Sequence, residues 1–542
     1  MGETLSGIAA SPGLAAGPSY RIAPRPELPP AIAVSDADTE AARALDALTS
    51  VVADLGRRAA AAGGVAADIL DAQIMMADDD MLHEDVEARV RAGTDAPHAI
   101  TEALAVHRAA FEAAGGYLAE RVADLDDLRD RAVAASLGLA MPGIPSPGHP
   151  FALVAGDLAP ADTAGLDPGQ VLALVTEMGG PTSHTAILAR ALGLPAVVGC
   201  AGALGVGDGV LVTVDGTRGR VETGVDESTV ERIREQEAAR KEKLSTVTGP
   251  GRTADGHPVA LLANVGSAND RMDEAEGIGL FRTELRYLDR AEAPGFDEQV
   301  ETYTGVFRAM VGRKVVVRTL DAGADKPLPF LFAADEPNPA LGVRGLRVAR
   351  RHPEILRTQL DAIATAARAE DAEVWVMAPM VATVAEAADF VARCRDAGIA
   401  KAGVMVEIPA AALRAKALLD VVDFISIGTN DLSQYTLAAD RQCAELADLL
   451  DPWQPALLDL LAMCAAAGGA TGKPVGICGE AAADPGLAVV LAGMGIDSLS
   501  MSARAIPAVR EALAAHTLDE CRKAAAAALA AGDAASAKAA VG

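Results

Sequence analysis

Aromatic residues are scarce in this chain, which has 542 residues and only 3% Phe, Trp and Tyr. Its hydrophobic cores must therefore be built from Ala, Val, Leu and Ile. The 51% of hydrophobic and 23% of charged residues are typical of a folded chain and argue against disorder. The length corresponds to about three or four domains.

Paired cysteines and excess basic charge are also lacking. The chain has no C-x-x-C pair, so it indicates neither a zinc site nor a thioredoxin-like site, and scattered thiols fit a reducing compartment. The formal charge of −28 repels nucleic acid and anionic membranes. Such a surface attracts a basic protein partner, although simple solvation explains the same charge.

Targeting and membrane-spanning patterns are not visible. The start Met1-Gly2-Glu3-Thr4 lacks a basic stretch followed by an apolar one, so no secretory signal is predicted. No apolar run reaches the roughly 18 residues that a membrane helix needs. We therefore expect a cytoplasmic protein that neither inserts into membranes nor binds nucleic acid.

Composition changes along the chain predict an α/β domain with an insertion. Residues 1–22 and 145–225 contain short β-rich runs and turns, whereas residues 30–142 are Ala-rich with helical periodicity. We expect residues 1–22 plus 145–225 to form one α/β domain that carries an inserted all-α domain, because exposed loops tolerate insertions. The charged residues 226–250 predict a linker helix.

Strands and helices alternate over residues 251–542. Eight strands alternating with helices predict a TIM (β/α)8 barrel, and an open doubly wound sheet is the alternative. The expected strands are Val259–Val265, Gly277–Thr283, Lys314–Leu320, Val374–Met380, Lys401–Ile408, Val422–Gly428, Lys473–Gly479 and Asp497–Ser502.

Polar and charged residues stand at the C-terminal ends of these strands, where a barrel carries its active site. Arg and Lys gathered at one rim favour a phosphate or carboxylate ligand. Two carboxylates, Glu407 and Asp431, among those cations favour Mg²⁺. Ordinary surface salt bridges are the alternative for any single residue. The rim set is Arg282, Arg318, Glu407, Asn430, Asp431 and Cys478, with Lys326, Arg344 and Arg441 just downstream.

A second constellation is Gly179-Gly180-Pro181-Thr182-Ser183-His184-Thr185, between a predicted strand and a predicted helix. The glycines allow a tight turn, and free N–H groups at a helix start favour an anion. A histidine placed there can carry a phosphoryl group as a covalent intermediate. A helix cap or a packed residue is the bland alternative.

Long motifs resemble one family. GGPTSHTAILARALGLPAVVG looks like the phosphohistidine signature of the phosphoenolpyruvate (PEP)-utilising enzymes, and six further segments resemble their barrel motifs. Their order resembles the Enzyme I type of PEP–protein phosphotransferase, over nearly the whole chain. The six segments are AEGIGLFRTE, RTLDAGADK, NPALGVRGLR, VMVEIPAAA, SIGTNDLSQYTLAADR and GICGEAAADP.

The resemblance implies that a phosphoryl group passes from PEP to His184 and then to the carrier protein HPr, which starts sugar uptake. It implies a swivelling phosphohistidine domain, an HPr-binding helical domain, Mg²⁺ (or Mn²⁺) and a homodimer. The implied roles are His184 as nucleophile with Thr163 hydrogen-bonded to its ring; Arg282, Arg318, Lys326, Arg344, Asn430 and Arg441 in substrate binding; Glu407 and Asp431 as metal ligands; and Cys478 as the acid that protonates the enolate.

Departures from the family pattern concern the partner and the histidine motif. Gln73 stands where relatives often have His, Pro181 stands where Arg is common, and residues 123–127 lack a basic residue. A pyruvate phosphate dikinase or PEP synthase is a related alternative, but no nucleotide-grasping domain is visible. A non-catalytic PEP-binding regulator is an alternative of another class, which the presence of His184 and Cys478 disfavours.

Overall fold

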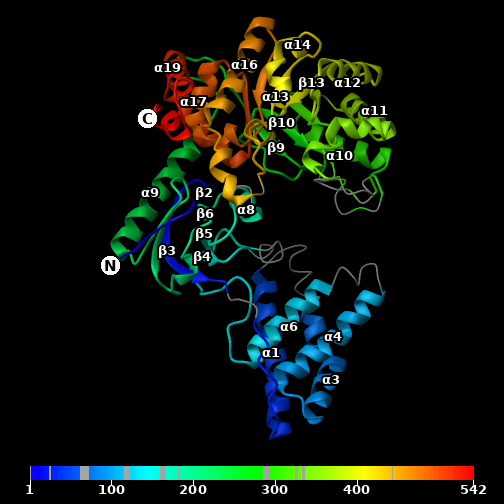
Figure 1. Ribbon diagram of the computed structural model, residues 1–542, viewed down its shortest axis with the longest axis vertical. Helices are drawn as coiled ribbons and strands as arrows, with labels where there is room; N and C mark the ends of the chain where they lie inside the picture. The colour runs from blue at the N-terminus through cyan, green and yellow to red at the C-terminus, as the bar shows by residue number, and fades with distance from the viewer. Residues whose placement is uncertain are drawn as a thin grey trace. The chain divides into compact units, whose positions relative to one another are not determined.

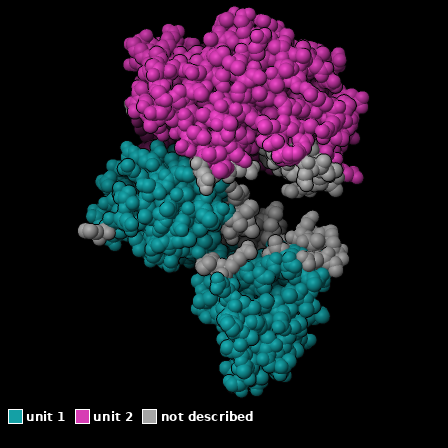
Figure 2. All heavy atoms as spheres, viewed as in Figure 1, with its two compact units in different colours: residues 1–237 teal, residues 238–542 magenta. Residues whose placement is uncertain are grey.

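The computed structural model describes residues 2–22, 26–61, 73–114, 122–158, 166–180, 183–284, 287, 290, 292–323, 328, 330–331, 336–370, 372–441 and 443–541. The chain divides into two compact units, residues 1–237 and residues 238–542 (Figure 2). Each unit has hydrophobic clusters of its own. Within the described ranges, no helix is long and apolar enough to span a bilayer.

An eight-stranded sheet is the centre of the α/β part of the first unit, with the order β1-β8-β7-β3-β4-β5-β6-β2. Strand β3 (Leu14–Arg21) pairs in parallel with β4 and antiparallel with β7, so the N-terminal segment folds together with strands that follow the inserted helices. The other strands are β1 (Thr4–Ser6), β2 (Ile8–Ser11), β4 (Phe151–Ala155), β5 (Val171–Thr176), β6 (Ala196–Val198), β7 (Leu211–Asp215) and β8 (Arg220–Thr223).

The insertion is helical, as predicted, and has its own core (Figure 1). Buried alanines such as Ala44, Ala99 and Ala132 allow the helices to approach closely around Leu48 and Leu128. An α/β domain with an inserted all-α domain is thereby confirmed as the fold class of this unit. The helices are α1 (Ala37–Ala61), α3 (Asp80–Arg91), α4 (Ala96–Ala114) and α6 (Val122–Ser136).

Helix α9 (Glu227–Thr246) falls within the predicted linker helix. Its Val230 and Ile233 are buried against Ala16 of β3. The start of this helix is therefore anchored on the sheet, while most of its other side chains are exposed and charged.

Eight parallel strands close into a barrel in the second unit, with the order β10-β11-β12-β13-β14-β15-β16-β9 (Figure 1). Closure confirms the predicted TIM barrel, and the open doubly wound sheet is wrong. The strands are β9 (Ala260–Val265), β10 (Gly277–Arg282), β11 (Lys314–Arg318), β12 (Glu373–Ala378), β13 (Lys401–Val406), β14 (Ile425–Ile427), β15 (Val475–Ile477) and β16 (Ser498–Met501).

Helices surround the barrel and bury their apolar faces against the strands. Leu280, Val316, Met377, Met405 and Phe424 fill the barrel interior, so it is a packed core. The helices are α10 (Phe296–Ala309), α11 (Pro353–Ala369), α12 (Val384–Asp396), α13 (Pro409–Leu413), α14 (Ala415–Leu419), α15 (Thr429–Leu437), α16 (Pro455–Thr471), α17 (Pro485–Met494), α18 (Ile506–Ala514), α19 (Leu518–Leu529) and α20 (Ala534–Ala539).

Candidate active site

The C-terminal ends of the barrel strands gather a buried set of charged side chains. Arg318 is the last residue of β11, Glu407 follows β13, Asp431 lies in the first turn of α15, and Cys478 follows β15. All four side chains are almost fully buried. Since the strands are parallel, residues distant in sequence meet at one rim.

Arg344 is enclosed by two carboxylates. Its Nε and Nη2 donate to Asp321 at 3.1 Å each, and its Nη1 and Nη2 donate to Asp431 at 3.0 and 3.1 Å. Burial opposes the charge of Arg344, but Asp321 and Asp431 raise its pKa further above the ordinary range. The guanidinium is therefore permanently charged and held in one orientation.

Arg318 lies beside the same aspartate. Its Nη2 donates to Glu284 Oε1 at 2.5 Å, and its Nη1 lies 3.2 Å from Asp321 Oδ2. Its Nε is buried and has no hydrogen-bond partner among the atoms that the structure describes. Burial without a partner is costly for such a donor, so Arg318 retains a donor for a ligand.

Glu407 is buried close to two other carboxylates, those of Asp321 and Asp431. Burial, and then the charges of Asp321 and Asp431, raise the pKa of Glu407 to about 8. Its Oε1 accepts a hydrogen bond of 2.6 Å from the backbone N–H of Met380, which has an unusual positive φ of 57°. Arg318 and Arg344 oppose this rise, but burial and the two aspartates outweigh them.

Cys478 is buried beside these charges. Burial raises the pKa of its thiol to about 11, although a hydrogen bond with Ser426 and the charges of Arg318 and Arg282 lower it. Its Sγ lies 3.5 Å from the carbonyl oxygen of Ile427. The thiol is therefore protonated at neutral pH.

The other predicted rim residues are less enclosed. Arg441 lies 3.7 Å from Asp431, and Asn430 accepts a hydrogen bond of 3.1 Å from the backbone N–H of Glu480. Arg282 is exposed at the end of β10 but lies close enough to influence the Cys478 thiol. Lys326, Thr163 and Pro181 lie outside the described residues.

Asp321 and Glu284 were not predicted from the sequence, yet Asp321 pairs with both buried arginines and Glu284 pairs with Arg318. Asp321 is fully buried and belongs to the RTLDAGADK segment, three residues after the end of β11. The strand-end criterion selected Arg318. It would also have selected Asp321 if it had included the three residues that follow the strand.

His184 is the first residue of α8 (His184–Leu192), in the first unit. Ser183 caps this helix by accepting a hydrogen bond from the backbone N–H of Ala186 at 3.3 Å. Gly179, with φ of 96°, makes the turn that leads to it. The N–H groups of a first helical turn favour an anion.

The donor set of the rim decides whether a metal ion fits there. The described ranges contain no group of three or more His, Cys, Asp or Glu side chains that could hold a metal ion. However, Mg²⁺ is usually held by one or two carboxylates together with substrate oxygens and water. Glu407 and Asp431 supply two buried carboxylates at this rim, and such oxygen donors suit Mg²⁺. The residues therefore fit a hard divalent cation completed by substrate oxygens.

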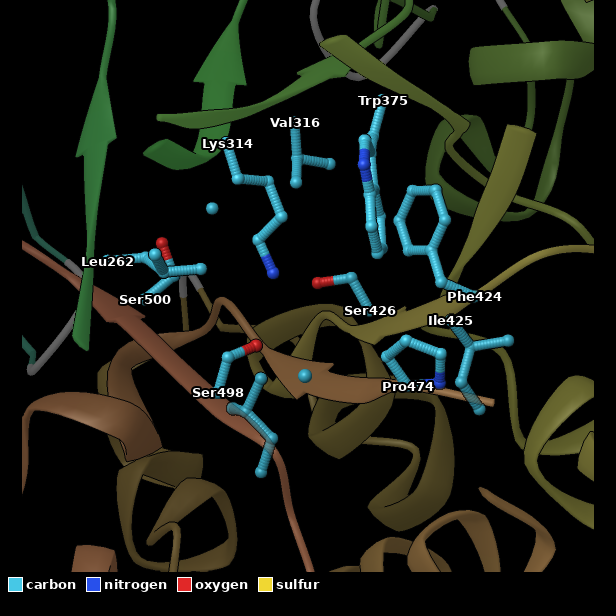
Figure 3. Close-up of a pocket in the computed structure, with 13 residues that line it drawn as sticks. Leu262, Lys314, Val316, Trp375, Phe424, Ile425, Ser426, Pro474, Ser498 and Ser500 are labelled. Carbon is cyan, nitrogen blue, oxygen red and sulfur yellow. The ribbon is translucent and has the colours of Figure 1, made fainter. Parts of the chain in front are cut away.

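A cavity inside the barrel is distinct from this rim (Figure 3). Its lining includes Lys314 and Ser498, which begin β11 and β16, so it lies toward the opposite end of the barrel. The Lys314 ammonium lies 4.8 Å from the centre of the Trp375 ring. A volume of ≈ 20 Å³ holds about one water molecule and no organic substrate.

Three parts of the chain match domains of one family. Residues 6–121 match the description "PEP-utilising enzyme, N-terminal", residues 149–219 match "PEP-utilising enzyme, mobile domain", and residues 240–518 match "PEP-utilising enzyme, PEP-binding domain". Enzymes of this family depend on a metal ion. His184 lies within the residues that match the mobile domain, and the buried rim lies within those that match the PEP-binding domain.

Curated relatives are similar over nearly their full lengths. A phosphoenolpyruvate-protein phosphotransferase of Streptomyces coelicolor is 53% identical over 539 residues, which cover 98% of this chain and 97% of the relative. Proteins of the same description from Staphylococcus carnosus and Bacillus subtilis are 38% and 37% identical, and each match covers 93% of both chains.

Proposed function

The chain belongs to the PEP-utilising enzymes as a phosphoenolpyruvate–protein phosphotransferase, and from this premise we propose that His184 carries the phosphoryl group between PEP and a carrier protein. The observation that carries the proposal is the place of His184 at the start of α8, after a glycine-led turn. Neutral His184 attacks phosphorus, the bond from phosphorus to the enol oxygen breaks, and the enolate of pyruvate leaves.

The cationic rim binds the phosphate and carboxylate of PEP. The unpaired Nε of Arg318 supports this role, because a phosphate oxygen would satisfy it. Arg344 donates four hydrogen bonds to Asp321 and Asp431, so it holds these carboxylates in place and adds positive charge to the proposed phosphate site. The proposed substrate-binding residues are Arg282, Arg318, Lys326, Arg344, Asn430 and Arg441.

Glu407 and Asp431 hold Mg²⁺ in this proposal. The crowding of Glu407 with the carboxylates of Asp321 and Asp431 supports it, and the oxygen donors suit a hard cation. The ion, when bound, neutralises charge that develops on the phosphoryl group and the enolate. Asp431 also pairs with Arg344 and Arg441, so it links the metal site to the substrate cations.

Cys478 acts as the general acid that protonates the carbon atom of the enolate. Its thiol donates a proton to C3 of the enolate, pyruvate forms, and the thiolate regains a proton from solvent. The pKa of about 11 supports this role, because the thiol remains protonated until the enolate appears beside it.

The acceptor in the second half-reaction is HPr, which docks on the helices of residues 30–142. Asp78, Asp79 and Asp80 at the start of α3 give this surface an acidic cluster, which would steer a basic partner. Such steering predicts slower association as salt rises. Gln73 is buried and lies 3.4 Å from Asp124, so its departure from the family pattern affects packing as well as docking. The homodimer is part of the same proposal.

Pyruvate formed in a single turnover tests the proposal. Mixed with excess PEP and Mg²⁺, without carrier or nucleotide, the enzyme should release one pyruvate per active chain as a burst. His184→Ala should release none. A full burst from His184→Ala would contradict the assignment of the nucleophile.

A further inference from the structure

Cys478 lies just beyond the last residue of β15, where the regular strand pairing ends. Pairing of β15 with β16 ends at Ile477 and Leu499. The backbone N–H of Cys478 still donates to Ile427 on β14 at 3.0 Å. Its carbonyl accepts instead from a side chain: Asn264 Nδ2 donates to it at 3.1 Å.

Asn264 reaches Cys478 from β9, across the intervening strand β16. The side chain is held at its other end, because Ser500 Oγ of β16 lies 2.6 Å from Asn264 Oδ1. Ser500 Oγ also lies 3.1 Å from the carbonyl oxygen of Ala263. The chain Ser500–Asn264–Cys478 therefore joins three neighbouring strands. The Cys478 carbonyl can only accept, so it turns the Asn264 nitrogen toward itself, while Ser500 holds the amide oxygen.

Space for this chain is provided by a glycine on the next strand. A Cβ added to Gly279 of β10 would lie 2.4 Å from Ser500 Oγ. Ser500 is buried on the inner wall of the barrel, where Figure 3 shows it with Ser498 and Leu262. Ser500 is thus enclosed by the barrel, and Asn264 is half-buried beside it.

We propose that Asn264, oriented by Ser500, is the positioning residue that aims the Cys478 thiol at one face of the enolate. This inference rests on the proposed role of Cys478. An amide donor on the Cys478 carbonyl fixes the peptide that carries the thiol, just beyond the last strand pairing. A displacement of the catalytic group by about 1 Å can lower the rate about 10²-fold.

Stereochemistry reports this role directly. An enolate protonated by a fixed acid gains its proton on one face, whereas enolpyruvate released into water is protonated on both faces. PEP that carries one deuterium and one tritium on C3 in known geometry therefore gives pyruvate with a chiral methyl group only when the acid is correctly placed. The readout does not depend on the amount of folded enzyme, because it examines only product that was formed.

The test compares three variants with the wild type in the full-length enzyme. Asn264→Asp replaces the donor by an oxygen of the same shape, and Ser500→Ala removes the group that orients the amide. Ser498→Ala is the matched control, because Ser498 lines the same inner wall on β16 but makes no hydrogen bond to Asn264 within the described structure. Each is measured for the rate of phosphorylation by PEP and for methyl chirality.

Asn264→Asp should slow phosphorylation about 10- to 100-fold and yield largely racemic pyruvate. Ser500→Ala should lose part of the chirality, and Ser498→Ala should retain all of it. A slow Asn264→Asp enzyme that keeps full chirality would overturn the inference, as would an unchanged rate and chirality. A rise in KM alone would mean that Asn264 contacts the substrate, which also overturns it.

Cys478→Ala separates this inference from the proposed acid. If Cys478→Ala gives racemic pyruvate while Asn264→Asp keeps chirality, Cys478 is the acid and Asn264 does not position it. If Cys478→Ala itself keeps chirality, the proposed role of Cys478 is wrong.

Discussion

At the residue scale, the rim is dominated by titratable groups that are largely removed from water. Carboxylates outnumber the two arginines enclosed with them: Glu284, Asp321, Glu407 and Asp431 surround Arg318 and Arg344. Burial of so many charges is expensive and rarely stabilises a fold better than apolar packing. An arrangement of this kind is expected where a metal ion and an anionic substrate complete the set.

Asp321 is the carboxylate shared by both arginines, so its removal should be costly. Asp321→Asn should lower the free energy of unfolding of the barrel unit by about 3–5 kcal/mol and abolish phosphorylation. Urea denaturation of the metal-free enzyme measures the first effect. Asp420→Asn is the control, because the Lys416–Asp420 pair is exposed and should contribute less than about 1 kcal/mol. Equal shifts in the two variants would contradict the account.

The Cys478 thiol offers a pH test. With a pKa of about 11, raised mainly by burial, the thiolate fraction should grow about tenfold per pH unit from pH 7 to 10. Alkylation of Cys478 by iodoacetamide in the substrate-free enzyme, followed by mass spectrometry, should accelerate in the same proportion. A rate that levels off near pH 8 would show a thiolate at neutral pH, which cannot serve as the acid.

At the scale of elements, the sequence predicted the barrel strands well but did not predict the contacts between their side chains. All eight barrel strands were expected, because parallel strands buried on both faces appear as short runs rich in Val, Ile and Leu. The predicted C-terminal ends of the strands identified four residues of the buried rim: Arg318, Glu407, Asp431 and Cys478. Periodicity carries no information on hydrogen-bond partners, so the enclosure of Arg344 by Asp321 and Asp431 could not be predicted.

The N-terminal segment shows another limit of the sequence. Residues 1–22 read as a short strand-rich segment, but the structure divides them into β1, β2 and β3, which pair with β8, β6, β4 and β7. These pairings are distant in sequence and depend on the assembly of the whole sheet. The local pattern therefore predicted strands, but it could not predict which strands pair with each other.

Two glycines give matched tests of element packing. A Cβ at Gly479, after β15, would lie 1.9 Å from Thr429 Oγ1 and 2.6 Å from Thr429 N. Gly479→Ala should therefore displace the segment after β15, which carries Cys478, and the start of α15, which carries Asn430. We expect a loss of about 1–3 kcal/mol in stability together with most of the PEP-dependent activity. Gly469 in α16 has no atom within 4 Å of its added Cβ, so Gly469→Ala should stabilise slightly and leave activity unchanged. Thermal denaturation and initial rates of phosphorylation distinguish the two.

At the scale of the whole molecule, the two chemical tasks belong to different units. The proposed acceptor, His184, lies in residues 1–237, and the proposed PEP-binding rim lies in residues 238–542. In this proposal one histidine serves both the barrel and a carrier protein, and such a cycle would require the two units to move relative to each other. The charged helix α9, which spans the boundary between the units, is the segment where such a movement would be accommodated.

The most direct test of the account is the transfer of labelled phosphate from PEP to His184. The enzyme is incubated with ³²P-labelled PEP and Mg²⁺ in the absence of any nucleotide, and the labelled peptide is sequenced. We predict acid-labile, base-stable label on the peptide that contains His184, no label after chelation of the metal, and none in His184→Ala. Stable label in His184→Ala, or label that requires a nucleotide, would contradict the central claim.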